Sequence, residues 1–502
     1  MLVRGAGPRA GGDVRIGQEL CLEVAKPVLG GDGLARHAGM AVFVPGALPG
    51  QRILARVSSV KARHARADLI QVLEQSPEYV QPSCPHFGCC GGCDWLHMDY
   101  ARQLHWKREL VRETLRHIAT EDVQVATTIA SPQVRNYRNK MEFAAASRVV
   151  TNTGDTTRGL STGKADVALG LRPRGLANAV VPIHSCALCP QVMVDVMNLV
   201  GQWAGKTGLP AYDPDTGRGF WRHLVVRHGA EIGHVMLSLI TGQDSRGRCV
   251  GPRLAQYVTN NLAGHSLTSL SVVHETRTDR ALLAQGQRSV SVTGPKHLLH
   301  ELGNLQLAIS SRSFFQVNSG AAQKLFGVVA DFAGLDERES VWDLYSGVGA
   351  IALGLAGKAR QVVGIETDPQ AVRDAQANAR RNGIANCRFE AGDVSRTISR
   401  VLGDPAFERP DVIVVDPPRA GMRAEVVAQL LKIGAPKLIL VSCDPATLAR
   451  DIKVLAAGYR PSRVQPVDMF PHTSHIECVV ELCRRDPVAP SKRCPHASRR
   501  TC

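Results

Sequence analysis

The feature that most constrains the fold is an alternation of short apolar runs and helical patterns in the last third of the chain. The apolar runs are Ser340–Tyr345, Gln361–Glu366, Asp411–Asp416 and Leu438–Ser442. Helical patterns separate them, for example Pro369–Asn382 and Ala424–Ile433. Strands that alternate with helices form a parallel sheet covered on both faces. We therefore predict an α/β, doubly wound, Rossmann-like domain over residues 335–484.

A glycine-containing loop follows the first apolar run. The strand pattern in VWDLYSGVGA (341–350) ends at Gly347-Val348-Gly349, and the next run ends in Glu366. Glycines let a ligand approach the backbone, and an acid at the end of the next strand accepts ribose hydroxyls. Asp393 follows a third strand pattern and is placed to bind an adenine amino group. The pattern indicates a nucleoside cofactor, and a purely structural turn is the alternative.

Two further strand patterns end in residues that carry chemistry. Asp416 is followed by a rigid Pro417-Pro418 corner, which predicts a slot for a planar substrate. Cys443 follows an apolar run and precedes a helical pattern. Because a helix N-terminus lowers the pKa of a thiol, we predict an activated nucleophile there. A strand-terminating turn and a buried cysteine are the alternatives.

Glu477 stands among apolar residues in HIECVVEL (475–482). An acid inside a strand pattern is unexpected unless it has a task such as proton transfer. His472 and His475 lie nearby, and we interpret both as structural.

A cysteine cluster lies in CPHFGCCGGCDW (84–95). Cys84, Cys90 and Cys93 are spaced for a metal centre, and two glycines allow the chain to wrap around it. Three thiolates need a fourth ligand, for which Cys186 and Cys189 are the candidates. The spacing does not separate zinc from iron–sulfur, and buried core cysteines are the remaining alternative.

Short strand patterns separated by glycine turns fill residues 14–78. They are Glu19–Lys26, Met40–Val44, Arg52–Val60 and Arg66–Glu74. This pattern predicts a small β-barrel, a shape that often binds single-stranded nucleic acid.

The pattern of residues 134–334, between the barrel and the Rossmann-like domain, predicts a mixed α/β structure. We predict an amphipathic helix with a basic outer face at Tyr100–Ile118, and a second helix at Gln191–Trp203. Polar stretches at 151–166 and 241–252 are interpreted as exposed loops, and the tail 485–502 as basic and disordered.

The net charge of +15 is unevenly distributed. Residues 335–482 hold 18 Lys and Arg against 19 Asp and Glu, whereas residues 1–334 carry +11. This excess of positive charge favours a polyanionic partner bound by the residues that precede the Rossmann-like domain in the sequence. No apolar stretch suits a membrane helix and no secretory signal is evident, so we expect a cytoplasmic protein with reduced cysteines.

Taken together, these residues resemble the RNA uracil-5-methyltransferase family, which makes 5-methyluridine with S-adenosylmethionine (SAM). Residues 14–78 are similar to its TRAM domain, and residues 79–334 to its central domain. YRNKMEFA (137–144) and SFFQVN (313–318) match central motifs of the family. Ala350 departs from a frequent asparagine and Ser346 from a frequent cysteine.

The resemblance implies a role for each candidate residue. Cys443 would be the nucleophile and Glu477 the base. The SAM site would be formed by Gln316, Tyr345, Glu366, Asp393 and Asp416. A 4Fe–4S cluster, characteristic of one branch of the family, would be held by Cys84, Cys90, Cys93 and Cys186.

The implied partner is RNA, more in keeping with 23S ribosomal RNA than with transfer RNA. We expect no membrane or DNA partner, and a monomer. Two other classes stay open: a radical-SAM methylthiotransferase, whose C-x3-C-x2-C motif the cluster does not show, and a non-catalytic RNA-binding iron–sulfur protein.

Overall fold

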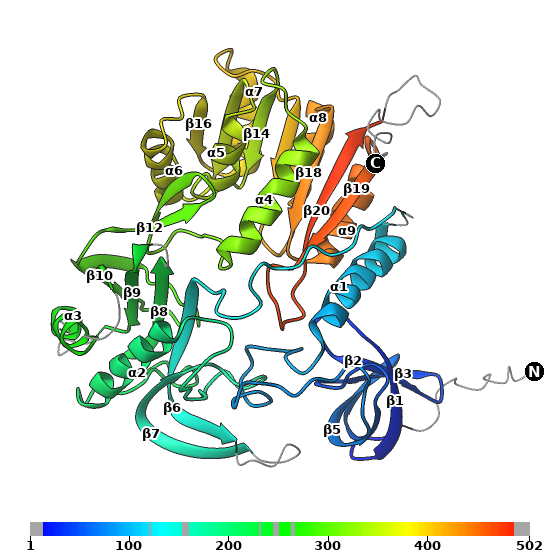
Figure 1. Cartoon of the computed structure of the whole chain (residues 1–502), viewed down its shortest axis with the longest axis vertical. Coiled ribbons are helices and arrows are strands. Elements are labelled where there is room, and N and C mark those ends of the chain that lie inside the picture. The colour runs from blue at the N-terminus through cyan, green and yellow to red at the C-terminus, as the bar shows by residue number, and fades with distance from the viewer. Residues whose placement is uncertain are drawn as a thin grey trace, which may run out of the picture.

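The computed structural model describes residues 14–119, 121, 123–152, 160–229, 232–243, 250–262 and 267–485. Three regions surround the middle of the molecule (Figure 1): a barrel at lower right, a six-stranded sheet at lower left and a seven-stranded sheet above them. Of the predicted tail 485–502, residues 486–502 lie outside the described residues. In the described part of the chain, no helix is long and apolar enough to cross a membrane.

The N-terminal region is a closed barrel with the strand order β1-β2-β3-β5-β4, as predicted. Its strands are β1 (Glu19–Pro27), β2 (Gly33–His37), β3 (Met40–Val44), β4 (Arg52–Val60) and β5 (His64–Glu74). Strict alternation in β1 turns Leu20, Leu22 and Val24 into the barrel core. The sequence patterns missed β2, which lacks an apolar run.

The central region is built on a sheet with the order β11-β10-β9-β8-β6-β7. Its strands are β6 (Lys140–Asn152), β7 (Leu160–Gly170), β8 (Trp221–Gly229), β9 (His234–Thr241), β10 (Ser269–Thr276) and β11 (Arg288–Thr293). Helices α2 (Gln191–Gly205) and α3 (Val250–Asn261) pack on it, and a hairpin of β12 (His297–Leu302) and β13 (Leu305–Ser310) follows.

The loop predicted at 151–166 is wrong at both ends, because β6 and β7 extend into it as a long hairpin. The loop predicted at 241–252 is wrong at its end, where α3 begins. Residues 153–159 and 244–249 lie outside the described residues.

The C-terminal region is the predicted Rossmann-like domain. Its sheet has the order β16-β15-β14-β17-β18-β20-β19. The strands are β14 (Ser340–Leu344), β15 (Gln361–Glu366), β16 (Cys387–Ala391), β17 (Val412–Val415), β18 (Lys437–Ser442), β19 (Tyr459–Val467) and β20 (Glu477–Arg484). The helices are α4 (Ser319–Ala333), α5 (Ala350–Ala356), α6 (Pro369–Arg381), α7 (Val394–Gly403), α8 (Ala424–Ile433) and α9 (Pro445–Leu455).

Two features of this sheet position the site. The strand order reverses between β14 and β17, which opens a crevice at the carboxyl edge. The strand β20 runs antiparallel to β18, so its first residue reaches that same edge.

Residues 95–129 pack on the Rossmann-like domain, although they follow the barrel in sequence. Helix α1 (Tyr100–Thr114) and the π-helical turn η1 (Leu115–Ala119) contact α9. Buried Val111 and Leu115 share a core with Leu448 and Ile452 of that helix. Beyond η1, backbone bridges join Val125 to Val464 and Ile129 to Val467, alongside β19.

Candidate active site

The predicted nucleophile and base come together through strand register. The antiparallel pairing of β18 with β20 ends at Ser442 opposite Cys478. One residue further, Cys443 leaves β18 where Glu477 enters β20. Asp416 follows β17, the neighbouring strand, so three of the predicted residues meet at one sheet edge.

Burial dominates the electrostatics of these three groups. It raises the pKa of Asp416 to about 7. It also raises the pKa of Glu477 well above its usual range, with the charge of Asp416 adding to the effect. The pKa of Cys443 rises to about 11, again through burial and then through the neighbouring Glu477 charge. The free enzyme therefore holds Cys443 as a neutral thiol at pH 7.

The expectation of a lowered thiol pKa at Cys443 is wrong, and the cap of α9 supplies a reason. The side chain of Asp444 accepts hydrogen bonds from Ala446 N and Thr447 N, both at 2.9 Å. This carboxylate takes up N–H groups that would otherwise face a thiolate.

Arg419 opposes these upward shifts, and the sequence patterns did not single it out. Its positive charge lowers the pKa of both Cys443 and Glu477. It stands just past the Pro417-Pro418 corner and lines the cavity beside the site. Its position after Asp416 in DPPRAG was the available signal, because a cation beside a predicted nucleophile is chemically informative.

The glycine loop and Glu366 lie together at the carboxyl edge, where the sequence predicts a nucleoside cofactor. Gly347 N donates to Glu366 Oε2 at 2.9 Å, and Asp368 N donates to Oε1 at 2.9 Å. The backbone of Tyr345 is left-handed, with φ of 65°, and its N–H donates to Ile365 O at 2.8 Å. This turn brings Tyr345, Glu366 and Asp393 near one another, since each acid influences the pKa of the Tyr345 hydroxyl.

Asp393 is placed as the N-cap of α7. Its Oδ1 accepts from Ser395 N and Arg396 N, and its Oδ2 accepts from Arg423 Nη1 at 2.9 Å. Both of its oxygens therefore have partners within the chain.

Asp343 is an acid that the sequence patterns missed. It is fully buried in β14, where Oδ2 accepts from Ala352 N at 3.0 Å. Its Oδ1 has no hydrogen-bond partner among the described residues. Burial and the charge of Asp416 raise its pKa well above the usual range. An acid inside the apolar run 340–345 was the signal for it, as it was for Glu477.

Gln316 reaches the site from the segment between the hairpin and α4. Asn139 Nδ2 donates to Gln316 O at 2.9 Å, and Asn139 N donates to Val317 O at 2.8 Å. The two central motifs, 137–144 and 313–318, are thus joined directly. Gln316 is buried and lines the cavity described next.

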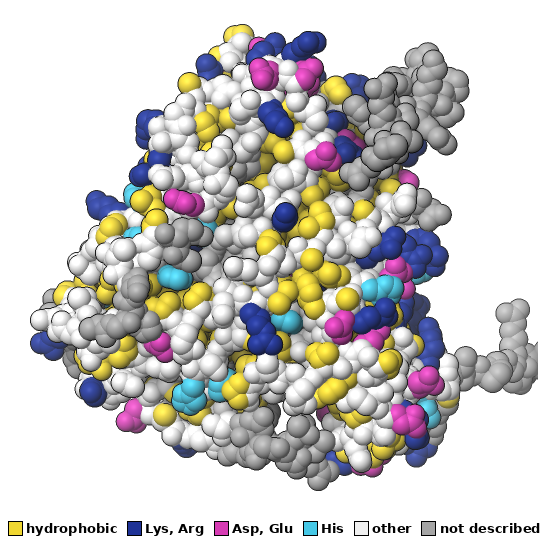
Figure 2. All heavy atoms as spheres, in the orientation of Figure 1, with side chains coloured by type: hydrophobic (Ala, Val, Ile, Leu, Met, Phe, Trp, Pro, Cys, Tyr) yellow, Lys and Arg dark blue, Asp and Glu magenta, His cyan; other side chains and the backbone are white. Residues whose placement is uncertain are grey.

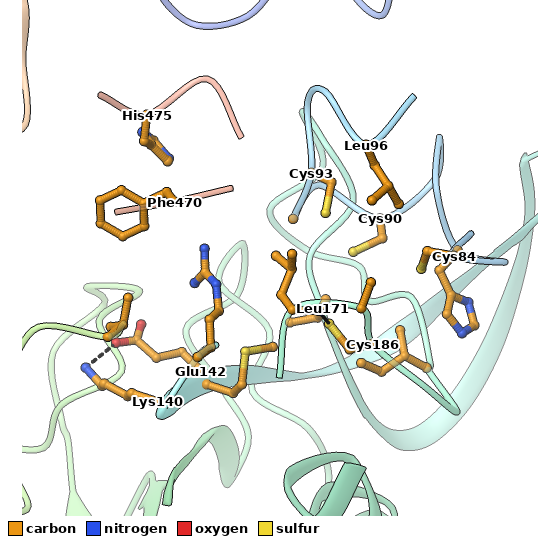
Figure 3. Close-up of a pocket in the computed structure, with 18 of the residues that line it drawn as sticks. Cys84, Cys90, Cys93, Leu96, Lys140, Glu142, Leu171, Cys186, Phe470 and His475 are labelled. Carbon is orange, nitrogen blue, oxygen red and sulfur yellow. Dashed lines mark hydrogen bonds and ion pairs between the residues drawn. The ribbon is translucent and has the colours of Figure 1, made fainter. Parts of the chain in front are cut away.

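A cavity of about 480 Å³ extends from the cysteine cluster to Arg419, Phe470 and His475, whereas Asp416, Cys443 and Glu477 are not among its lining residues. Cys84, Cys90, Cys93 and Cys186 line one end. Gln316, Arg419, Phe470 and His475 line the other. Figure 3 shows the four cysteines on one side and Phe470 and His475 across from them.

The structure separates the two candidates for the fourth cysteine. Cys186 lines the cavity, whereas Cys189 is buried in the core of the central region. A hydrogen bond with the Cys189 thiol lowers the pKa of Cys186 to about 6. Burial raises the pKa of Cys90 to about 12. Within the described residues, no three His, Cys, Asp or Glu side chains are close enough to hold a single metal ion.

A Rossmann-like sheet with a glycine loop and acids at its carboxyl edge is an arrangement that binds nucleoside cofactors, and similarity to known proteins assigns this chain to the class of SAM-dependent methyltransferases. The family model described as tRNA (Uracil-5-)-methyltransferase matches residues 303–485, and the TRAM domain model matches residues 13–70. The chain belongs to the RNA uracil-5-methyltransferase family, whose reaction is SAM-dependent methylation of uracil C5 in RNA.

Relatives match nearly the whole chain. An uncharacterized RNA methyltransferase of Nitratidesulfovibrio vulgaris is 39% identical over 459 residues, which cover 91% of this chain and 94% of that protein. One from Geobacter sulfurreducens is 38% identical over 464 residues, covering 91% and 88%.

One solved structure is similar over the whole fold. It is the tRNA (uracil-54, C5)-methyltransferase of Pyrococcus abyssi in complex with S-adenosyl-L-homocysteine. The TM-score is 0.68 at 26% identity, over 92% of this chain and 99% of that one.

Proposed function

We propose that methylation proceeds through a covalent bond between Cys443 Sγ and uracil C6, with Glu477 as the base. The observation that carries this is the strand register that brings Cys443 and Glu477 to one edge beside Asp416. These two side chains then act on adjacent carbons of one ring, C6 and C5.

The chemistry explains why both residues are needed. Uracil C5 is a weak nucleophile until Cys443, after losing its thiol proton to water, adds to C6 as a thiolate and moves the C5=C6 electron pair toward C5 and O4. C5 then takes the methyl group. Glu477 removes the C5 proton, the C5=C6 bond re-forms, and Cys443 leaves as a thiolate.

The acids at the sheet edge fit a cationic cofactor. Asp343 has a buried oxygen without a hydrogen-bond partner among the described residues, and the charge of Asp416 raises the cost of a negative charge on Asp343. SAM would supply the methyl group and, as a sulfonium, a positive charge that offsets these carboxylates. We propose that Gln316, Tyr345, Glu366, Asp393 and Asp416 hold it.

We propose that Cys84, Cys90, Cys93 and Cys186 hold a 4Fe–4S cluster. The four thiols line one end of the cavity rather than converging at a single-ion distance, which fits a cluster better than one zinc ion. The cluster would hold the central region together, because the reaction has no redox step.

We propose ribosomal RNA as the substrate, bound across the barrel and α1. Figure 2 shows Lys and Arg side chains gathered on the right-hand rim, over α1 and the barrel. Arg112 and Arg116 are exposed, as the basic face predicted for Tyr100–Ile118 requires. Mapping of 5-methyluridine in a deletion strain separates ribosomal from transfer RNA.

Tritium release tests the mechanism. RNA carrying 5-tritiated uracil should lose tritium in the presence of SAM and the full-length protein, one tritium for each methyl group transferred. Methyl transfer by the Cys443→Ala variant would overturn the covalent route.

A further inference from the structure

The base Glu477 is preceded by a loop that is anchored from outside its own sheet. We call residues 468–476, which join β19 to β20, the base loop. Its side chains Phe470 and His475 line the same cavity as the four cysteines. Glu477 itself and the residues after it are held by strand pairing, in which Glu477 lies opposite Val467 of β19. The N-terminal side of Glu477 depends on how the base loop is held.

The residue after the last cysteine of the cluster motif holds the base loop directly. Asp94 N and Trp95 N donate to His472 O at 3.1 and 3.0 Å. Asp94 Oδ2 accepts from Ser474 N at 3.0 Å and from Ser474 Oγ at 2.7 Å. Asp94 thus binds the loop three residues before Glu477.

Helix α1 adds two more anchors. The buried Gln103 accepts from His472 N at 2.8 Å, while its Nε2 donates to Met98 O at 2.8 Å. Lys107 Nζ donates to Asp468 Oδ1 at 2.6 Å and to Phe470 O at 3.0 Å.

The backbone of the base loop is in a conformation that needs such support. His472 has φ of 66°, in the left-handed region that disfavours a residue with a side chain. Strained residues of this kind persist where the surrounding structure over-determines them. Asp94, Trp95 and Gln103 all bind the backbone of His472.

The barrel also packs against the contact between Asp94 and Ser474. A Cβ atom on Gly31 would lie 3.0 Å from Ser474 Cβ and 3.1 Å from Asp94 Cβ. Trp95 Nε1 donates to Gly31 O at 3.3 Å. All three regions of the chain therefore meet at this point.

We propose that Asp94 is a positioning residue for Glu477, and that it controls removal of the C5 proton rather than addition of Cys443. The inference rests on the proposed function. Cys443 stands between β18 and α9, which are placed by the sheet and not by Asp94. Loss of the Asp94 contact should displace the base while leaving the nucleophile in place. This gives the cysteine segment a task in a reaction without a redox step.

The test measures two quantities for each variant, the amount of protein–RNA adduct and the rate of tritium release from C5. We call the ratio of the two the partition. The full-length protein, purified without oxygen, is mixed with 5-tritiated RNA and methyl-labelled SAM. For Asp94→Ala we expect tritium release to fall by about 10²-fold, a typical effect of small misplacement. A methyl-labelled protein–RNA adduct should accumulate on a denaturing gel, as expected for Glu477→Gln.

Two variants serve as controls. Arg174 pairs with Asp94 on the side away from Ser474, so Arg174→Gln should leave the partition unchanged. Asp94→Asn keeps an acceptor oxygen for Ser474 and should restore tritium release relative to Asp94→Ala.

Each outcome decides the proposal. Wild-type partition in Asp94→Ala overturns it, and so does loss of adduct and tritium release together in a folded variant. If Asp94→Ala does not fold, Ser474→Ala decides, since it removes only the hydroxyl donor: adduct accumulation supports the proposal and wild-type partition overturns it. A wild-type enzyme that transfers the methyl group without releasing tritium, or an active Cys443→Ala variant, would instead overturn the proposed function.

Discussion

Cys443 directly follows strand β18, and Glu477 is the first residue of strand β20, which runs antiparallel to β18. Both residues therefore lie at the same sheet edge, one residue beyond the pair Ser442–Cys478. Because β20 reverses direction, a residue at the start of one strand meets a residue just past the end of another. A fully parallel sheet would place the start of that strand at the opposite edge.

Cys443→Ala should abolish tritium release and adduct formation while SAM affinity stays within about twofold of wild type, because the thiol acts on uracil and not on the cofactor. Activity assays and calorimetric titration with SAM measure the two effects. Turnover by this variant would contradict the assignment.

Glu477→Gln should form the Cys443 adduct, transfer the methyl group and then stall, since the C5 proton has no acceptor. The expected result is a methyl-labelled protein–RNA band on a denaturing gel. Wild-type tritium release with no such band would exclude Glu477 as the base.

The reactivity of Cys443 should follow its raised pKa of about 11. A raised pKa keeps the thiol neutral at pH 7, so alkylation by iodoacetamide should quicken by about tenfold per pH unit up to that pKa. Arg419→Gln should raise the pKa further and slow alkylation at a given pH. Mass spectrometry of the Cys443 peptide measures the rate, and a plateau near pH 8 would contradict the assigned environment.

Lys107→Ala should destabilise the fold by about 3–5 kcal/mol, because it leaves Asp468 as an unpaired charge in the interior. Both side chains of this pair are wholly buried. Chemical denaturation measures the change. The double variant Lys107→Met with Asp468→Leu should recover much of the loss, and additivity of the two single changes would contradict the pairing.

Cys186→Ser should lose iron and sulfide, whereas Cys189→Ser should keep both, because Cys186 alone of the two lines the cavity. Protein purified without oxygen should be brown. Retention of iron by Cys186→Ser with loss in Cys189→Ser would reverse the ligand choice. Zinc without sulfide in the wild type would exclude the cluster and leave the methyltransferase assignment intact.

Apolar runs in the sequence predicted the strands that are buried on both faces. The strands β14, β15, β17 and β18 agree with their predicted runs to within about a residue, because a strand covered on both faces is apolar throughout. The same rule located Glu477 as an exception.

Features that depend on contacts between distant parts of the chain could not be predicted from the sequence. The placement of the base loop depends on contacts from Asp94 and Gln103, which are distant from it in the chain. The raised pKa of Cys443 depends on burial and on the neighbouring Glu477 charge, and neither can be read from the apolar pattern around Cys443.

The packing of residues 95–129 on the last sheet has a consequence for how this enzyme can be divided. A fragment that starts at residue 297 would keep every strand of the catalytic sheet, together with helix α4 and the hairpin of β12 and β13, which share its core. It would also expose the outer edge of β19, which Val125 and Ile129 now cover, and the apolar face of α9 beneath η1. An uncovered strand edge beside an apolar patch favours self-association. The catalytic half should therefore aggregate when made alone and become soluble when residues 95–129 are supplied with it.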